Sequence, residues 1–282
     1  MHPIAAQFMR RPSACQRARR NTDMERTLLA CYAHPDDESY GAGGAIAKYA
    51  AEGVRCYIVT ATSGEVGLDH RSEGETELGD HRIEELACAA ETLGAEPPVI
   101  LGFPDGGVEG HIEDVAARYL ATFEELRPDV VLTFDKTGVT GHADHLAIHR
   151  AVTDAFQQWD ARGSRLFYSL LPRAQFSKLA RLLEDAGIAS AFENFPEWDG
   201  SPVPPDGSYG PRVTPDDWIT TTLEVDGVKK RDAIRCHHSQ LGPEAAFVAM
   251  PDDMAALAFG TEYYMLAAGS SSGTEADLFG SD

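Results

Sequence analysis

The sequence predicts an α/β fold: a Rossmann-like, mostly parallel sheet with helices on both faces and a C-terminal elaboration. Three observations indicate it. Short apolar runs alternate with longer segments of helical periodicity. The 282 residues suffice for one sizeable domain, and 43% of them are hydrophobic, enough to bury a core. Because strands that alternate with helices form right-handed βαβ units, we expect a parallel sheet covered on both faces.

The strand predictions rest on short apolar runs rich in β-branched and aromatic residues. The first run, Thr27–Ala33 (TLLACYA), precedes a Gly/Ala-rich helix, and Val54–Thr62 follows that helix. The predicted strands cover residues 27–33, 54–62, 99–103, 129–134, 166–171 and 218–225.

The helix predictions rest on apolar side chains that recur every three or four residues. Ile83, Leu86 and Ala90 share one face of a segment that ends at Gly94, and Pro128 stops the next helix. The predicted helices cover residues 41–52, 79–93, 113–126, 144–159, 176–186, 228–240 and 244–257.

We expect one domain over residues 24–268. Residues 1–23 carry several arginines that no apolar segment follows, so we expect a disordered N-terminal arm rather than a signal peptide. Residues 196–217 are rich in proline and glycine and predict a long surface loop. Residues 269–282 are rich in serine, glycine and acid and predict a flexible acidic tail.

The charge of the chain argues against two classes of partner. Its net charge is −21, from 45 acidic and 24 basic residues, and such a surface repels nucleic acid and anionic membranes. No apolar run approaches the roughly 20 residues that a membrane span needs. We therefore expect neither a nucleic-acid nor a membrane partner, while self-association into a homo-oligomer stays open.

The five cysteines are scattered and contain no CxxC pair. Their odd number and spacing argue against a disulfide framework and against a thiolate zinc site. The pattern indicates a reducing compartment, so we expect a cytoplasmic protein.

Polar clusters follow four of the predicted strands. They are His34–Glu38, Ser63–Glu65, Pro104–Gly106 and Asp135 with Gly141–His145. Ligands of open α/β sheets bind outside the carboxyl ends of the strands. These clusters should therefore meet at one edge of the sheet and form an active site.

The first cluster, HPDDE, places one imidazole and three carboxylates within five residues. Adjacent Asp36 and Asp37 must point in different directions, so one can bind a metal while the other faces the water that the metal activates. The alternative is an acidic helix start favoured by the helix dipole, with His34 on the surface.

The fourth cluster, HADH, places His142 and His145 three residues apart near one face of a helix. Asp144 can orient an imidazole through its ring N–H. The alternative is a capping aspartate with two incidental histidines. Two histidines and one carboxylate form a known catalytic zinc set with a fourth position for water, so Zn²⁺ is the leading cofactor and Fe²⁺ or Co²⁺ are substitutes.

These motifs carry a family resemblance. AHPDDE (33–38) and GHADH (141–145) resemble the PIG-L/LmbE-type zinc-dependent N-acetylglucosaminyl deacetylases, and the likeness extends over roughly residues 24–265. Supporting motifs are TSGExG at 62–67, an LGxxRxxEL-like segment at 78–86, FPDG at 103–106, CHHSQ at 236–240 and FGTEYYM at 259–265.

The resemblance implies the site residues. It makes His34, Asp37 and His145 the zinc ligands and Asp36 the general base. It implies that His142, oriented by Asp144, protonates the departing amine or stabilises the oxyanion. The implied substrate contacts are Arg82, Asp105 and, less directly, Glu65.

Some of these positions have simpler explanations. Arg82 can be a surface cation paired with Glu85, and Asp105 can be a turn residue before Gly106. For His237 and His238, the sequence favours packing near the pocket over metal ligation.

Two positions depart from the family pattern. Ala143 replaces a proline, which should leave the chemistry unchanged. Thr140 stands where the mycothiol-pathway enzyme has a tyrosine near the scissile carbonyl, which weakens an assignment to that pathway's substrate.

The sequence therefore predicts a zinc-dependent hydrolase that removes an N-acyl group, expected to be acetyl, from a small amino sugar or glycoconjugate. The alternative within hydrolases is an amidase for a larger sugar or thiol conjugate. A non-catalytic sugar- or metal-binding protein on the same fold would not need Asp36 and His142, and both are present. A nucleotide-binding protein would need a glycine-rich phosphate loop where the acidic HPDDE stands.

Overall fold

The computed structural model describes residues 26–71, 77–161, 163–185, 212–242, 249–270 and 276–280. The predicted N-terminal arm and most of the predicted loop 196–217 lie outside this part of the chain. Within it, no helix combines the length and the apolar character needed to cross a bilayer.

One mixed sheet forms the centre of the protein, in the order β3-β2-β1-β4-β5-β7-β6. The first five strands of the chain run parallel, and β7 pairs antiparallel with β5 and with β6. The strands are β1 (Thr27–Tyr32), β2 (Arg55–Thr60), β3 (Val99–Ile100), β4 (Val130–Phe134), β5 (Arg165–Leu170), β6 (Thr221–Glu224) and β7 (Thr261–Ala268).

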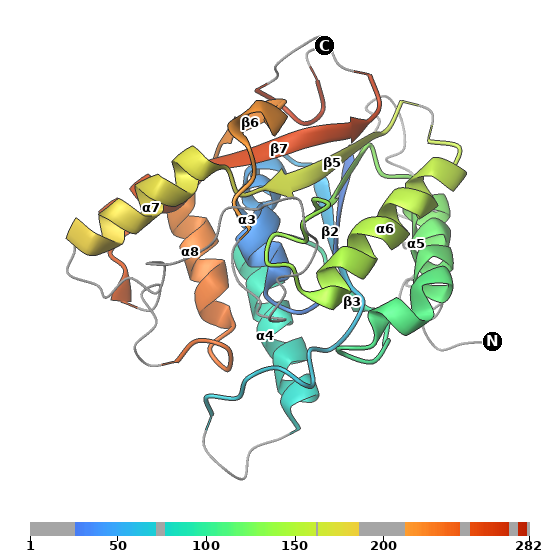
Figure 1. The fold of residues 1–282 in the computed structure, drawn as a ribbon, viewed down its shortest axis with the longest axis horizontal. Coiled ribbons are helices and arrows are strands. Elements are labelled where there is room, and N and C mark those ends of the chain that lie inside the picture. Colours follow the sequence, from blue (N-terminus) through green and yellow to red (C-terminus); the bar gives the residue numbers. More distant parts are fainter. Residues whose placement is uncertain are drawn as a thin grey trace, which may run out of the picture.

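Helices cover both faces of this sheet (Figure 1). On one side α3, α4 and α8 pack on one another, with α10 against α8 and α7, and on the other side α5 packs against α6. The α-helices are α3 (Asp37–Ala51), α4 (Leu78–Leu93), α5 (Ile112–Leu126), α6 (Ala143–Gln158), α7 (Arg173–Asp185), α8 (Gly227–Cys236) and α10 (Asp252–Phe259), with 3₁₀ turns η1 (Val108–His111) and η2 (Asp216–Trp218).

The predicted fold class is confirmed, and the differences concern boundaries and the C-terminal part. Helix α3 begins at Asp37, four residues before its predicted start. The helix predicted over 228–240 ends at Cys236. Of the helix predicted over 244–257, residues 244–248 lie outside the described residues, and α10 begins at Asp252. The sequence does not predict strand β7, whose residues are of mixed burial.

The order of the strands in the sheet reverses at β1. This strand pairs with β2 on one side and with β4 on the other, and all six of its residues are buried. The connection after β1 leads to β2 on one side of β1 and the connection after β3 leads to β4 on the other, and ligands of open α/β sheets bind at such a reversal, at the carboxyl ends of the strands. The fold therefore fixes the place of a ligand site before any side chain is considered.

A buried carboxylate on β7 connects the sheet to two helices. Glu262 Oε1 accepts hydrogen bonds from Gly44 N at 2.8 Å and Lys230 Nζ at 2.6 Å. Its Oε2 accepts from Ala45 N at 2.8 Å and from the Tyr264 hydroxyl at 2.6 Å. These four bonds hold α3 and α8 on the sheet.

Glycine is required where α3 makes this approach. A Cβ on Gly44 would lie 2.5 Å from Val225 Cγ2 and 3.0 Å from Glu262 Oε1. The GAGG segment thus serves close packing of the helix on the sheet.

The cysteine expectation is wrong for two residues. Cys88 on α4 and Cys236 at the end of α8 form a disulfide, whereas Cys31 and Cys56 are free and buried. Sequence spacing could not pair residues 148 positions apart. The disulfide removes one premise of the predicted reducing, cytoplasmic location. This location stays a prediction.

Part of the predicted acidic tail packs on the domain. Leu278 is fully buried and its N–H donates to the Tyr49 hydroxyl at 2.8 Å. Phe279 lies against the Tyr49 ring and under the Arg26 guanidinium. Residues 276–280 are therefore ordered against the protein rather than free.

The Glu262 contacts predict a large effect on stability. Glu262→Gln leaves the Lys230 cation buried without a charged partner and turns one acceptor oxygen into a donor that faces other donors. We expect a loss of about 3–5 kcal/mol in the free energy of unfolding, measured by denaturant titration. Glu224→Gln at an exposed position is the control, and equal unfolding midpoints for both variants would refute this role.

Candidate metal centre and active site

The site lies at the carboxyl ends of β1 and β4. His34 follows β1 by two residues, and Asp36 and Asp37 form the N-cap and first residue of α3. His142 is the N-cap of α6, with Asp144 and His145 in its first turn. Two predicted clusters from distant parts of the sequence therefore meet here.

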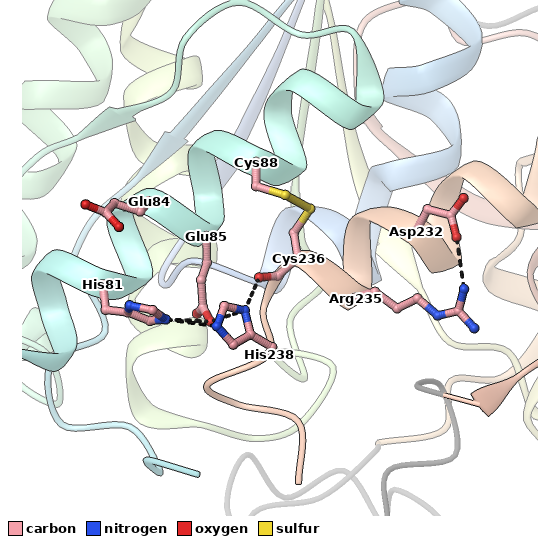
Figure 2. A pocket seen from close by; sticks show the side chains of 8 residues that line it. All are labelled: His81, Glu84, Glu85, Cys88, Asp232, Arg235, Cys236 and His238. Atoms are coloured by element: carbon pink, nitrogen blue, oxygen red, sulfur yellow. Dashed lines mark hydrogen bonds and ion pairs between the residues drawn. A yellow bond between two sulfur atoms is a disulfide. The ribbon is translucent and has the colours of Figure 1, made fainter. Parts of the chain in front are cut away.

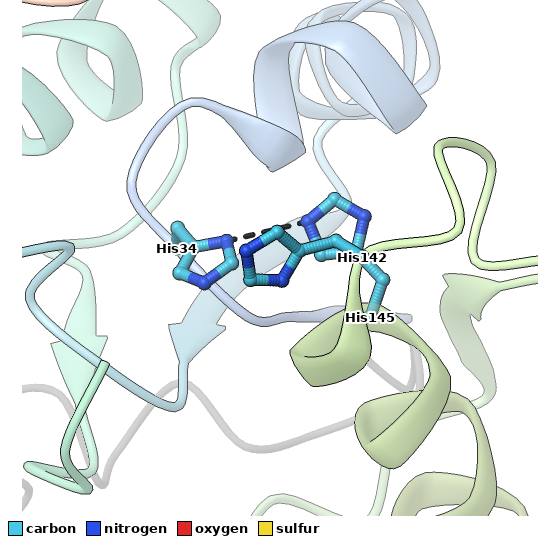
Figure 3. Close-up of side chains that lie close together, drawn as sticks. All are labelled: His34, His142 and His145. Atoms are coloured by element: carbon cyan, nitrogen blue, oxygen red, sulfur yellow. Dashed lines mark hydrogen bonds between the residues drawn. The ribbon is translucent and has the colours of Figure 1, made fainter. Parts of the chain in front are cut away.

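Three donor groups converge at the centre. His34 Nδ1 lies 3.3 Å from His145 Nε2, and the two oxygens of Asp37 lie 3.3 Å from His34 Nδ1 and 3.2 Å from His145 Nε2. His142 joins them, and one ring nitrogen each of the three histidines lie within 4.8 Å of one another (Figure 3). These side chains could hold a metal ion.

The ring nitrogens of His34 and His145 that do not face the centre lie close to other polar groups of the protein. His34 Nε2 lies 3.1 Å from Asp105 Oδ1 and 3.3 Å from Asp144 Oδ2. His145 Nδ1 lies 2.9 Å from the Gly138 carbonyl oxygen, to which it can donate, and 3.1 Å from Thr140 Oγ1. Such bonds orient an imidazole and leave its other nitrogen available as a ligand.

The structure gives Asp144 contacts with both His34 and His142. Its carboxylate accepts from Gly106 N at 2.7 Å and Val108 N at 3.1 Å and contacts His34, so it orients His34. Its backbone N donates to His142 Nδ1 at 3.2 Å, while the orientation of His142 by the Asp144 carboxylate stays a prediction.

Charged side chains at the centre strongly shift the pKa values of His34 and Asp37. Burial lowers the pKa of His34, but Asp105, Asp144 and Asp37 outweigh it and raise that pKa well above its usual value. Burial raises the pKa of Asp37, but His145 and His34 outweigh it and hold that pKa well below its usual range. Several carboxylates thus create a field that favours positive charge at this point.

Asp36 has a different environment from Asp37. It is a non-glycine residue with φ of 115°, a conformation that costs energy and that clusters at functional sites. Burial raises its pKa to about 6, with Arg82 opposing the shift and Asp37 adding to it. A carboxylate with this pKa is charged at neutral pH and is basic enough to accept a proton.

Arg82 positions Asp36. Its guanidinium is buried, lies 3.2 Å from Asp36 Oδ2 and donates to the carbonyl oxygens of Gly64 and Pro35. A Cβ on Gly64 would lie 2.3 Å from Arg82 Nη1, so glycine is needed for this approach. Arg82 is therefore buried against Asp36 and is not a surface cation paired with Glu85.

His142 is held as a neutral donor. Its Nδ1 accepts from Asp144 N, which leaves the proton on Nε2. Burial lowers the pKa of His142, and the positive charges of His34 and His145 lower it further. Its ring centroid lies 4.9 Å from that of His34 and 5.1 Å from that of His145.

The predicted substrate contacts Glu65 and Asp105 lie beside each other at the edge of the site. Glu65 Oε1 accepts from Asp105 N at 2.9 Å, and Asp105 Oδ2 accepts from Val66 N at 2.9 Å. Asp105 is more than a turn residue, because its second oxygen faces His34.

One structural contact near the site was not anticipated. Glu38, the last acid of HPDDE, is fully buried, and His237 Nε2 lies 2.8 Å from its Oε1. Burial raises the pKa of Glu38, but the charge of His237 outweighs it and the pKa is lowered. His237 thus packs behind the site, as the sequence favoured, whereas His238 is exposed.

Comparison with known proteins places this fold and site in a class. The family described as GlcNAc-PI de-N-acetylase, PIG-L, matches residues 29–156. The "1D-myo-inositol 2-acetamido-2-deoxy-alpha-D-glucopyranoside deacetylase" of Acidothermus cellulolyticus is 35% identical over 91% of this chain and 95% of its own length. The chain belongs to the PIG-L family.

Solved structures agree on the fold. The N,N'-diacetylchitobiose deacetylase of Pyrococcus horikoshii matches with a TM-score of 0.53 at 19% identity over 86% of this chain and 83% of its own. A 4-carboxy-2-hydroxymuconate hydratase of Pseudomonas putida matches equally, with a TM-score of 0.53 at 19% identity over 88% of this chain and 98% of its own. Since one fold carries two reactions, the reaction must be argued from the site.

Proposed function

We propose that this protein is a zinc-dependent hydrolase that removes an acetyl group from the nitrogen of an amino-sugar substrate. The observation that carries the proposal is the convergence of His34, Asp37 and His145 beside Asp36, a carboxylate with a pKa of about 6. The metal, the ligand set and the residue roles below are parts of this proposal.

The donor set fits zinc. A tetrahedral Zn²⁺ with bonds of about 2.0–2.1 Å separates its ligands by roughly 3.3 Å. His34 Nδ1 and His145 Nε2 lie 3.3 Å apart, which matches one edge of such a tetrahedron, and Asp37 lies within 3.3 Å of both nitrogens through a different oxygen for each. Two imidazoles and a carboxylate without a thiolate also admit Fe²⁺ or Co²⁺.

When bound, the cation would polarise the acyl carbonyl and acidify a nearby water. Asp36, held by Arg82, accepts a proton from the attacking water. The Nε2–H of His142 donates to the oxygen that gains negative charge as the carbonyl carbon becomes tetrahedral. Protonated Asp36 then returns the proton to the departing amine nitrogen.

The neutral state of His142 favours this division of roles. An imidazole whose pKa is lowered donates a hydrogen bond at neutral pH without first being protonated. Of the two roles expected for His142, oxyanion stabilisation therefore fits better than supply of a proton to the amine.

The substrate class is argued from the relatives. The relative with 35% identity is named for a sugar acetamide linked to inositol, and its likeness spans nearly the whole chain. We propose a small N-acetylated glucosamine conjugate as the substrate. Thr140 argues against a substrate pocket identical to that of the mycothiol-pathway enzyme, which has a tyrosine at this position. The Thr140 hydroxyl contacts His145.

The substrate proposal is tested by release of amine. The zinc-loaded protein should release free amine fastest from N-acetylglucosaminyl-inositol and more slowly from N-acetylglucosamine and diacetylchitobiose, because the related enzyme acts on the inositol conjugate. Free amine and acetate are measured in parallel. Faster turnover of a larger thiol or sugar conjugate would favour the alternative amidase, and no release from any compound would favour a non-catalytic binding protein.

The ligand proposal is tested by metal content. His34→Ala, Asp37→Ala and His145→Ala should each lower bound zinc by one equivalent per chain and lower activity, whereas His142→Ala should lose activity and keep this zinc. Elemental analysis after gel filtration measures the content, with His111→Ala at an exposed position as control. Unchanged zinc in all three ligand variants would remove the proposed centre.

The base proposal is tested with Asp36→Asn, which keeps the side-chain volume but cannot accept a proton. Turnover should fall by about 10²–10⁴ while zinc stays bound. In the wild type, kcat/KM should rise with pH through about 6, because protonated Asp36 cannot act as a base. The variant should lose this rise, and near-normal turnover or loss of zinc in it would contradict the assignment.

A further inference from the structure

A second group of possible ligands lies outside the candidate centre. His81 and Glu85 stand one turn apart on α4, and His238 reaches them from the turn that follows α8 (Figure 2). One ligand atom of each lies within 4.8 Å of the others. None of the three residues belongs to the site described above.

The distances within this group resemble those of the first. His81 Nε2 lies 3.1 Å from His238 Nε2 and 3.3 Å from Glu85 Oε1. Two imidazoles and one carboxylate again form the donor set that zinc uses together with water.

Contacts outside the group prepare two of the three donors. The Cys236 carbonyl oxygen lies 3.1 Å from His238 Nδ1 and can only accept, so the ring proton belongs on Nδ1. The Nε2 of His238 then offers a lone pair toward His81. Glu85 is nearly fully buried and is fixed by Ser239, whose N and Oγ donate at 2.6 and 2.7 Å.

The surroundings allow an ion to enter. The side chain of His238 is 64% exposed and that of His81 is 17% exposed. The three residues line a pocket of about 350 Å³ whose wall also contains Glu84 and the Cys88–Cys236 disulfide. Solvent can therefore complete the coordination of an ion held by three protein ligands.

We propose that His81, Glu85 and His238 bind a second divalent transition-metal ion of the zinc class. The ion joins α4 to the turn after α8, next to the disulfide that joins α4 to the end of α8. The neighbours of its ligands reach the candidate active site, since Arg82 contacts Asp36 and His237 contacts Glu38. The ion therefore stabilises α4 and the turn after α8. Residues of these two segments contact Asp36 and Glu38, the neighbours of the proposed ligand Asp37.

The test is a titration of the metal-stripped full-length chain with zinc chloride, followed by calorimetry and by elemental analysis after gel filtration. The wild type and the exposed-histidine control His111→Ala should bind two equivalents. His81→Ala and His238→Ala should each bind one. Because His238 is largely exposed, its variant should melt like the control in the presence of chelator, and zinc should raise its melting temperature by less.

A second background separates this site from the proposed function. The His34→Ala/His145→Ala chain should retain one equivalent, and adding His238→Ala should remove it. Zinc content of His81→Ala and His238→Ala equal to that of His111→Ala would overturn the proposal, whatever the fate of the first site. In that case the three side chains form a hydrogen-bonded cluster only.

Discussion

The position of the active site depends on the buried carboxylate of Glu262. Its four hydrogen bonds join α3, α8 and β7, and α3 is the helix that begins with Asp37. A helix start can place carboxylates accurately only if the rest of the helix is fixed on the sheet. Glu262 supplies this anchor, and the absence of a side chain at Gly44 allows it.

Chemically similar side chains of the site have different surroundings, and their pKa values therefore shift in different directions. Asp37 faces two imidazoles and its pKa is held low, while adjacent Asp36 is raised to about 6 by burial. His34 is surrounded by carboxylates and His142 accepts a backbone N–H. These differences support the proposed division of roles, in which one group of side chains binds a cation while the neighbouring group handles protons.

The fold and site could be predicted to different degrees. The five parallel strands and their helices could be predicted, because most of these strands are buried on both faces as continuous apolar runs and the helices bury one apolar face. The C-terminal part was harder, since β7 is an antiparallel strand of mixed burial and its pairing with β5 and β6 is a long-range choice. The motifs indicated which residues belong to the site, but not that Asp144 contacts His34 or that Arg82 reaches Asp36.

What the sequence determined by itself is the chemistry available at the carboxyl ends of the strands. HPDDE and HADH follow predicted strands, and the order of elements brings parallel strand ends to one edge. Only the tertiary structure decided that the Gly138 carbonyl oxygen contacts His145 Nδ1, that Asp105 and Asp144 contact His34 Nε2, and that Cys88 pairs with Cys236. These outcomes depend on distances between residues far apart in the chain, and local propensity and spacing carry no information about such distances.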